Sequence, residues 1–338
     1  MKYFLLLVLA LTSCGAPAEE PATAAPGCGL STTWQDDESC IADAGIHFGP
    51  IDYDDPKATA PFVMAPGSDA TFTVDAPIGD AVGKYVQSYR ARARAGNHHL
   101  TLLVRRAGTP DFAYRPYTTT LPGENFIPLR HDGSPVSFSH SPEYEGAAIV
   151  VPANTVSWVF DIHYLNTTTS PILMEGWVAL DVTDSPAVVL SYLQGNGGTQ
   201  MSVAPYSRAV VTAGGPTCTL PADVALVTVG AHQHTHGRGF SLSVNGELVY
   251  KNTDWEHPYG AVFASDTTNP PLTGASGARS GVVKIPKGTP ITWTCDIDND
   301  LATPIRYGSN LKTAEMCAFG ALFSPPLPNR TSWSCVTP

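Results

Sequence analysis

The 338-residue chain is poor in charged side chains, and basic residues are the scarcer kind. Only 14% of its residues are charged, and 19 basic against 30 acidic residues give a net charge of −11. A chain with this balance has no electrostatic basis for binding nucleic acid or for nonspecific attraction to anionic lipid headgroups. We therefore expect no nucleic-acid partner.

The motifs of several common enzyme classes are also absent. The sequence contains no phosphate-binding loop, no dinucleotide-binding fingerprint and no nucleophile elbow. It has no Cys-x-x-Cys pair either, which disfavours a metal site built from clustered cysteines. Any chemistry of this protein therefore has to use other side chains.

The only long apolar run near the N-terminus is too short for a permanent membrane span. Met1-Lys2 is followed by the apolar residues 3–10, a pattern that predicts a signal peptide over residues 1–13. Leu-Thr-Ser-Cys at positions 11–14 resembles a bacterial lipobox, in which Cys14 is lipidated, and an ordinary signal peptide is the alternative. Residues 14–41 then form a lipidated tether and N-terminal segment, rich in Ala, Pro and Glu over residues 15–27. We expect a lipoprotein of the bacterial cell envelope, held by its lipid at the outer membrane or cell surface.

Long helices are disfavoured by thirty glycines and thirty prolines. Alternating apolar and polar residues at 70–74 and 240–244 indicate strands, and Asn245-Gly246 after the second run is a hairpin signal. The chain after the tether is long enough for two medium domains. We predict an all-β fold with domains at residues 42–185 and 186–338.

Two groups of histidines stand out against this background. His232, His234 and His236 alternate after the apolar run 225–229, so on a strand they share one face and could bind one ion. His98 and His99 are adjacent and could share an ion only at a strand end or a bulge, together with His163 from another predicted strand. Any one of these histidines alone is more often a hydrogen-bonded structural or surface residue. We interpret His47, His131, His140 and His257 as structural or surface residues.

Met316 would be interpreted as core filler if it stood alone. A thioether together with two imidazoles, however, forms a ligand set that favours copper, because soft sulfur stabilises Cu(I) and nitrogen also tolerates Cu(II). The three imidazoles of the first group suit copper or zinc. The histidines and Met316 together therefore point to redox chemistry.

The order His-His, His-Tyr, His-x-His and Glu-Met-Cys resembles the copper type II ascorbate-dependent monooxygenases, the group of peptidylglycine alpha-hydroxylating monooxygenase and dopamine beta-monooxygenase. Residues 232–238, His-Gln-His-Thr-His-Gly-Arg, align without a gap to this family's His-Thr-His-x-x-Gly-Lys/Arg. The resemblance covers roughly residues 85–338 and is strongest after Cys218. It assigns His232 and His234 as ligands and leaves His236 as a neighbour, although His236 in place of one of them stays open.

The resemblance implies a fold and a chemistry. The fold is two jelly-roll-like β-sandwich domains, with one copper ion on each, facing across an open cleft. His98, His99 and His163 would hold the electron-storing copper, and His232, His234 and Met316 would hold the catalytic copper. The implied reaction hydroxylates a C–H bond of a small organic substrate with O2 and an external reductant such as ascorbate. A non-catalytic copper-binding or copper-buffering surface lipoprotein is the alternative, and an adhesive sandwich with incidental histidines is a third.

The cysteines and several departures from the family refine this expectation. With Cys14 processed, six cysteines remain, an even number that suits an exported protein with disulfides. The resemblance pairs Cys218 with Cys335 and Cys295 with Cys317, which leaves Cys28 with Cys40. Gly230 replaces the arginine that binds the substrate carboxylate in peptide-hydroxylating relatives, and Ala-Phe-Gly at 318–320 replaces their Asn-x-Tyr. Asp161 replaces a glutamine near the first group. We therefore do not expect peptidylglycine as the substrate.

Overall fold

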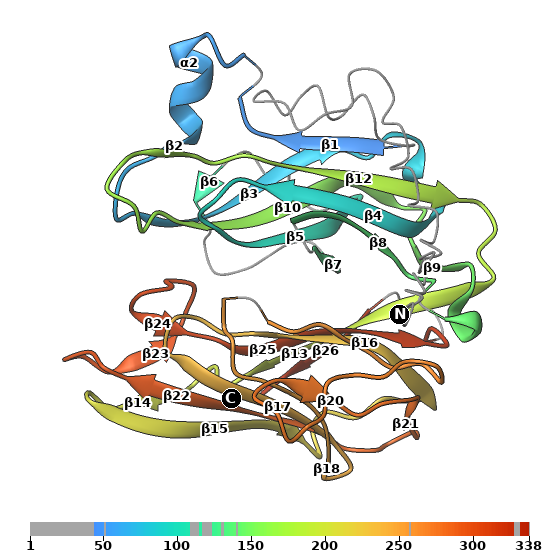
Figure 1. Ribbon diagram of the computed structural model, residues 1–338. Coiled ribbons are helices and arrows are strands. Elements are labelled where there is room, and N and C mark those ends of the chain that lie inside the picture. Colours follow the sequence, from blue (N-terminus) through green and yellow to red (C-terminus); the bar gives the residue numbers. More distant parts are fainter. Residues whose placement is uncertain are drawn as a thin grey trace, which may run out of the picture. The chain divides into compact units, whose positions relative to one another are not determined.

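The computed structural model describes residues 44–50, 52–108, 115–116, 124–129, 132–139, 141–256, 258–327 and 332–337. These residues belong to one compact unit spanning residues 41–338. Strands dominate this part of the chain, and its α-helix, α2 (Pro56–Thr59), is one turn long, so the expected all-β fold is confirmed (Figure 1). No helix within these ranges is long and apolar enough to cross a membrane. The expectations for the signal peptide, Cys14, the Cys28–Cys40 bridge, His131, His140 and His257 lie outside the described residues.

The largest sheet contains strands from both halves of the sequence. Its main path, in spatial order, is β1 (Ala44–Phe48), β12 (Gly176–Thr183), β4 (Tyr85–Ala93), β9 (Ala147–Val150), β13 (Val188–Gly197), β25 (Cys317–Ser324), β16 (Val224–His232) and β19 (Ala261–Val262). β8 (Asp132–Ser137), β21 (Val283–Ile285) and β26 (Ser332–Val336) pair with β4, β16 and β13. The predicted boundary at residues 185 and 186 falls between β12 and β13, and β13 itself pairs with both β9 and β25. Continuous strand pairing therefore connects the two halves.

A five-stranded sheet of the N-terminal half carries the first histidine group. Its order is β6 (Arg115–Pro116), β3 (Asp69–Pro77), β10 (Thr155–Leu165), β5 (Asn97–Arg106) and β7 (Glu124–Leu129), and β3, β10 and β5 lie side by side in Figure 1. Trp158, Phe160 and Ile162 of β10 are buried in a hydrophobic core that β4 and β12 complete. Because side chains alternate along a strand, Asp161 and His163 face away from that core.

A second five-stranded sheet belongs to the C-terminal half. Its order is β15 (Ser207–Gly215), β22 (Ile291–Asn299), β17 (Gly237–Val244), β18 (Glu247–Asn252) and β20 (Gly277–Ala278). It packs against the C-terminal strands of the large sheet, as the Trp293 and Phe319 rings show with centroids 5.1 Å apart. The predicted hairpin is confirmed, because β17 and β18 pair around Asn245-Gly246, both of which have positive φ.

Short elements complete the described part of the fold. They are the pairs β2 (Val63–Met64) with β11 (Ile172–Leu173), and β14 (Ser202–Val203) with β23 (Ile305–Tyr307) and β24 (Ala314–Glu315), and three 3-10 turns at Ala60–Phe62, Gly79–Ala81 and Pro142–Tyr144. Two disulfides, Cys218–Cys335 and Cys295–Cys317, join the C-terminal strands in the expected pairing. Cys295 lies on β22 and Cys317 begins β25, so the second bridge links the two sheets directly after Met316.

Candidate metal centre

The first histidine group is built by strand register. His163 on β10 lies directly opposite His99 on β5, and the register shifts at the next position, where Tyr164 pairs with Asn97. His98 is therefore the extra residue of an irregularity near the start of β5. The sequence requires a strand end or a bulge if His98 and His99 are to share an ion, and the structure has both.

The second group lies where a strand ends. β16 stops at His232, and His234 follows in irregular chain, so the predicted common strand face does not extend past His232. The rings of His232 and His234 nevertheless contact each other, with centroids 5.4 Å apart. His236 lies in the next turn, and its Nε2 is 2.9 Å from the carbonyl oxygen of Lys312. The structure thus brings together the two histidines that the family alignment assigns and directs His236 elsewhere.

The two groups form one cluster of five imidazoles. His98 is central, because its ring centroid lies 5.7, 5.5, 5.3 and 5.6 Å from those of His99, His163, His232 and His234. Potential ligand atoms converge in two triplets, His98 with His99 and His163, and His98 with His232 and His234, each within 4.8 Å. The resemblance implied two ligand sets facing across an open cleft, whereas here the sets are in contact and share His98.

The ring nitrogens in this cluster are arranged as metal ligands require. Nε2 of His98, Nδ1 of His99, Nδ1 of His163 and Nε2 of His234 are buried and have no hydrogen-bond partner among the described residues. A buried polar atom without a partner costs about 1–3 kcal/mol, so four such atoms in one place need an explanation. Metal coordination would provide it, because each unprotonated nitrogen can donate its lone pair to an ion.

The opposite ring nitrogens have partners that orient them. Oδ1 of Asp69 lies 2.7 Å from Nε2 of His163, and Oδ2 of Asp161 lies 3.3 Å from Nε2 of His99. His234 uses Nδ1 instead, 3.3 Å from the carbonyl oxygen of Ala314. Such outer contacts fix the ring orientation and the tautomer of a metal-binding histidine. Sequence reasoning noted Asp161 only as a departure from the family and missed Asp69.

Burial favours the neutral form of four of these imidazoles. It lowers the pKa of His98 and of His232 well below the ordinary value, and the neighbouring histidines add to the effect. Burial also lowers the pKa of His234 to about 3, and it lowers the pKa of His163 despite the opposing effect of Asp69. Because a neutral imidazole is the form that binds metals, the lowered pKa values of these four rings favour their ligating form at neutral pH.

Glu315 holds the backbone of the second group through hydrogen bonds. Its side chain is fully buried, and its carboxylate accepts the backbone N–H groups of His234, of Met316 at 2.9 Å and of His236 at 3.2 Å. Burial raises the pKa of Glu315 to about 7, although these hydrogen bonds oppose the shift. The carboxylate thus ties the backbone of two expected ligands, His234 and Met316, to one point. The Glu-Met-Cys motif contained this residue, but no role was assigned to it.

Two other residues shape the surroundings of the cluster. The ring of half-buried Trp255 lies 5.6 Å from that of His98, a contact that the sequence analysis did not predict. Gly230 lies on β16 two residues before His232, and a Cβ added there would meet no heavy atom within 4 Å. The position is therefore open and carries no cation.

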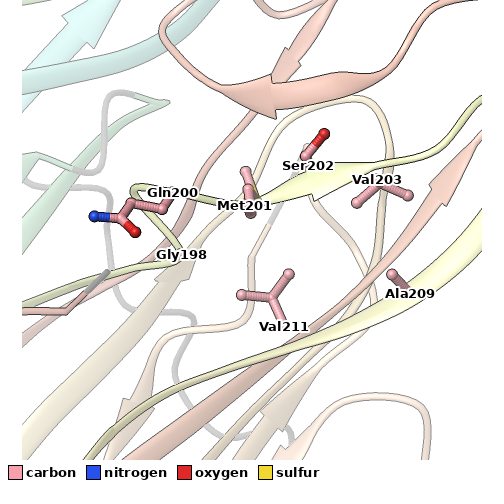
Figure 2. A pocket seen from close by; sticks show the side chains of 7 residues that line it. All are labelled: Gly198, Gln200, Met201, Ser202, Val203, Ala209 and Val211. Carbon is pink, nitrogen blue, oxygen red and sulfur yellow. The ribbon is translucent and has the colours of Figure 1, made fainter.

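A hollow elsewhere in the described chain does not include the histidines. Met201, Val203, Ala209 and Val211 line it, with Gly198, Gln200 and Ser202 (Figure 2). None of these side chains is ionisable, so the hollow offers no groups for acid–base or metal chemistry. The histidine cluster is the candidate functional site.

The chain matches no protein-family model and no curated protein. Among solved structures it is similar to the major capsid protein P2 from bacteriophage PM2, with 7% sequence identity and a TM-score of 0.32 over 85% of this chain and 98% of that one. It is also similar to BuGH86wt in complex with neoagarooctaose, with 10% identity and a TM-score of 0.18 over 79% of this chain and 35% of that one. At these TM-scores, neither likeness bears on function.

Proposed function

We propose that the protein is a copper-dependent monooxygenase that hydroxylates a C–H bond of a small organic substrate, using O2 and an external reductant such as ascorbate. The observation that carries this proposal is the convergence of five imidazoles, most of them with a buried nitrogen that has no partner among the described residues. Three further points are the types of ligand atom, the stoichiometry of the reaction with the residues that hold the ligands, and the residues around the cluster.

The donor set favours copper over zinc. Imidazoles alone suit either metal. Met316 adds a thioether directly after Glu315, whose carboxylate also holds the backbone of His234, and a soft sulfur donor favours Cu(I). His98, His99 and His163 would hold one copper ion, and His232, His234 and Met316 would hold the other.

Copper at these residues would supply one-electron redox chemistry and the activation of O2. One oxygen atom enters the substrate C–H bond and the other leaves as water, with two electrons and two protons from the reductant. Asp69 and Asp161 hold the rings of His163 and His99 in place, and Glu315 holds the backbone of His234 and Met316. Rigid support of this kind keeps ligands in a productive geometry.

The surroundings of the cluster constrain the substrate. Gly230 offers no side-chain cation, so a peptide carboxylate has no partner at that position. Trp255 presents an aromatic ring beside His98, which suits an apolar or aromatic part of a substrate. Lipidation of Cys14 would hold the enzyme at a bacterial envelope membrane, where small molecules, O2 and reductant are its partners.

The test is oxygen incorporation from labelled O2. The copper-loaded protein with ascorbate is incubated with a panel of small amines, aromatics and lipids, and the product mass is measured. We expect a product that gains one labelled oxygen atom, and only background product from the His232→Ala/His234→Ala variant. Glu247→Gln, a surface variant outside the cluster, is the control and should retain the activity. Copper retention without any oxygen incorporation would instead identify a copper-binding or copper-buffering protein.

A further inference from the structure

Asp69 contacts a histidine of the first group and the chain segment that precedes Met316. It begins β3, and its Oδ1 lies 2.7 Å from Nε2 of His163, in the first histidine group. Its other oxygen, Oδ2, accepts the backbone N–H of Leu311 at 2.7 Å, 242 positions further along the chain. Only 8% of the Asp69 side chain is exposed. A single buried carboxylate therefore contacts an expected ligand of one group and the segment that leads to Met316, the expected sulfur ligand of the other.

The contact with His163 determines which ring nitrogen is available. A carboxylate only accepts hydrogen bonds, so Nε2 of His163 must carry the proton and Nδ1 must be unprotonated. Nδ1 is the nitrogen that is buried without a partner among the described residues. Asp69 thus selects the tautomer that can bind a metal through Nδ1.

The contact with Leu311 is one of several that hold the same segment. The carbonyl oxygen of Leu311 accepts from Oγ1 of Thr235 at 2.6 Å, next to His234. Nζ of Lys312 donates to the carbonyl oxygen of Gly67 at 2.7 Å, two residues before Asp69. The turn before β3 and the segment before Met316 are therefore fastened together at two points.

We infer that Asp69 is a positioning residue that couples the two ligand groups, orienting His163 through Oδ1 and anchoring the Leu311 segment through Oδ2. The inference rests on the proposed copper binding, but it does not require that hydroxylation occurs. If it holds, the copper affinity of each group depends on this one carboxylate.

Asp69→Asn tests the need for two acceptor oxygens in a side chain of the same shape. The amide has one oxygen, so it cannot accept from both His163 and Leu311. If the amide oxygen still accepts from Leu311, the amide NH2 faces Nε2 of His163, and the histidine proton moves to Nδ1. If the amide oxygen instead accepts from His163, the hydrogen bond from Leu311 is lost. We expect either a changed His163 tautomer, read from ring ¹⁵N shifts of the metal-free protein, or faster hydrogen exchange at the Leu311 amide. Affinity for Cu(I), measured against a competing chelator, should fall by about 10- to 100-fold.

A second experiment tests the contact of Asp69 with Leu311 separately from its contact with His163. In a His99→Ala/His163→Ala background, the His163 partner of Asp69 is gone, and the remaining ligands are those of the second group with His98. Adding Asp69→Ala should still weaken Cu(I) binding by about tenfold, because the Leu311 segment is released. Asp75, on the same strand and bonded to Ser157 and Arg105, is the matched control position. Asp75→Asn and Asp75→Ala should leave Cu(I) affinity unchanged.

Three results would overturn the inference. One is an Asp69→Asn protein with unchanged tautomer, Leu311 exchange and Cu(I) affinity. Another is an unchanged affinity on adding Asp69→Ala in the double-alanine background, and the third is an equal loss in the Asp75 variants. These measurements need no substrate, so their outcome is separate from that of the oxygen-incorporation test. A protein that never hydroxylates but loses copper on Asp69 substitution would refute the monooxygenase proposal and leave this inference intact.

Discussion

The imidazole rings of the two histidine groups are held in position by different contacts. In the first, His99 and His163 stand opposite each other on paired strands, and Asp161 and Asp69 contact their outer nitrogens. In the second, His232 and His234 lie at and beyond a strand end, and the ring of His234 has a neutral carbonyl as its partner. Strand pairing and two aspartates position one group, whereas a strand end, a buried glutamate and a disulfide position the other.

This difference predicts different sensitivities. A carboxylate partner raises the basicity of a metal-binding imidazole more than a neutral carbonyl does. The imidazoles of the first group should therefore be the more electron-rich, and the copper affinity of this group should depend on the charge of the carboxylates around it. The second group should depend on the backbone constraints that bring His234 and Met316 together.

The largest effect is expected at His98, the ring that the two triplets share. His99→Ala should lower copper binding at the first group only, leaving about one firmly bound equivalent. His98→Ala should weaken both sites and reduce hydroxylation to background, because its ring contacts both groups. Copper analysis after removal of loosely held ions, with product mass, is the measurement. If His98→Ala retains the copper content of His99→Ala, the groups are separate and the shared ring is incidental.

The two disulfides should separate stability from copper binding. Chain-entropy estimates give about 4.7 kcal/mol for a loop near 100 residues and somewhat more than about 3 kcal/mol for a loop near 20. Cys218–Cys335 closes 117 residues and Cys295–Cys317 closes 22. Replacing the first pair by alanine should cost more unfolding free energy, whereas replacing the second should cost more Cu(I) affinity, because Cys317 follows Met316. Denaturant unfolding and chelator competition on both variants test this. Equal losses of Cu(I) affinity would show that the shorter bridge does not position the second group.

Charge dependence in the N-terminal half can be tested at Glu175. Its side chain is fully buried; burial raises its pKa, but hydrogen bonds from His47, Tyr53 and Arg94 outweigh this and leave the pKa below the ordinary 4.5. The stabilisation is thus present above about pH 4.5 and is lost as the pH falls through the lowered pKa. Glu175→Gln should cost about 3 kcal/mol at pH 7, and the cost should shrink in acid.

Denaturant unfolding of the metal-free protein between pH 3 and pH 7 measures this effect. Glu247→Gln is the control, since Glu247 contacts Arg279 at 2.8 Å on the surface, with 65% of its side chain exposed. An exposed pair of this kind contributes about 0–1 kcal/mol. A Glu175→Gln cost that stays constant with pH would show that the ionised carboxylate does not matter.

The smallest change in stability is expected from Met316→Ile. Isoleucine keeps the apolar volume and removes the sulfur, so the unfolding free energy should fall by less than about 1.5 kcal/mol. Product formation should fall far more than stability does. The copper K-edge spectrum of the reduced protein should lose its sulfur scattering, because the other proposed ligands are imidazoles. Full hydroxylation with an unchanged spectrum would make Met316 core filler.

Much of the fold could be predicted from local sequence patterns. Alternation at residues 70–74 and 240–244, together with Asn245-Gly246, predicted strands and a hairpin that the structure contains. The two C-terminal disulfides followed from the family resemblance and are confirmed. These features depend on neighbouring residues or on a shared motif, which is why they are readable along the chain.

The partners that surround the histidines were not predictable in the same way. Asp69 lies at the start of an ordinary alternating strand, and Trp255 lies in an irregular segment, so neither has a local signal of its role. Strand alternation also predicted that His232, His234 and His236 share one strand face. In the structure β16 ends at His232, and His236 lies in the following turn. Where a strand stops depends on pairing with distant segments, which local sequence does not contain.

The residue types available for chemistry can be read along the chain: six expected copper ligands, the cysteine pairs and the strands that carry most of them. Only the tertiary structure decided that the imidazoles form one cluster, with His98 in both triplets, and that Asp69 contacts both His163 and Leu311. The physical reason is that these contacts join residues far apart in the chain. They depend on β13, which pairs with β9 of the N-terminal half and with β25 of the C-terminal half. The outer face of β10 then lies beside the end of β16, where the rings of His163 and His234 contact each other.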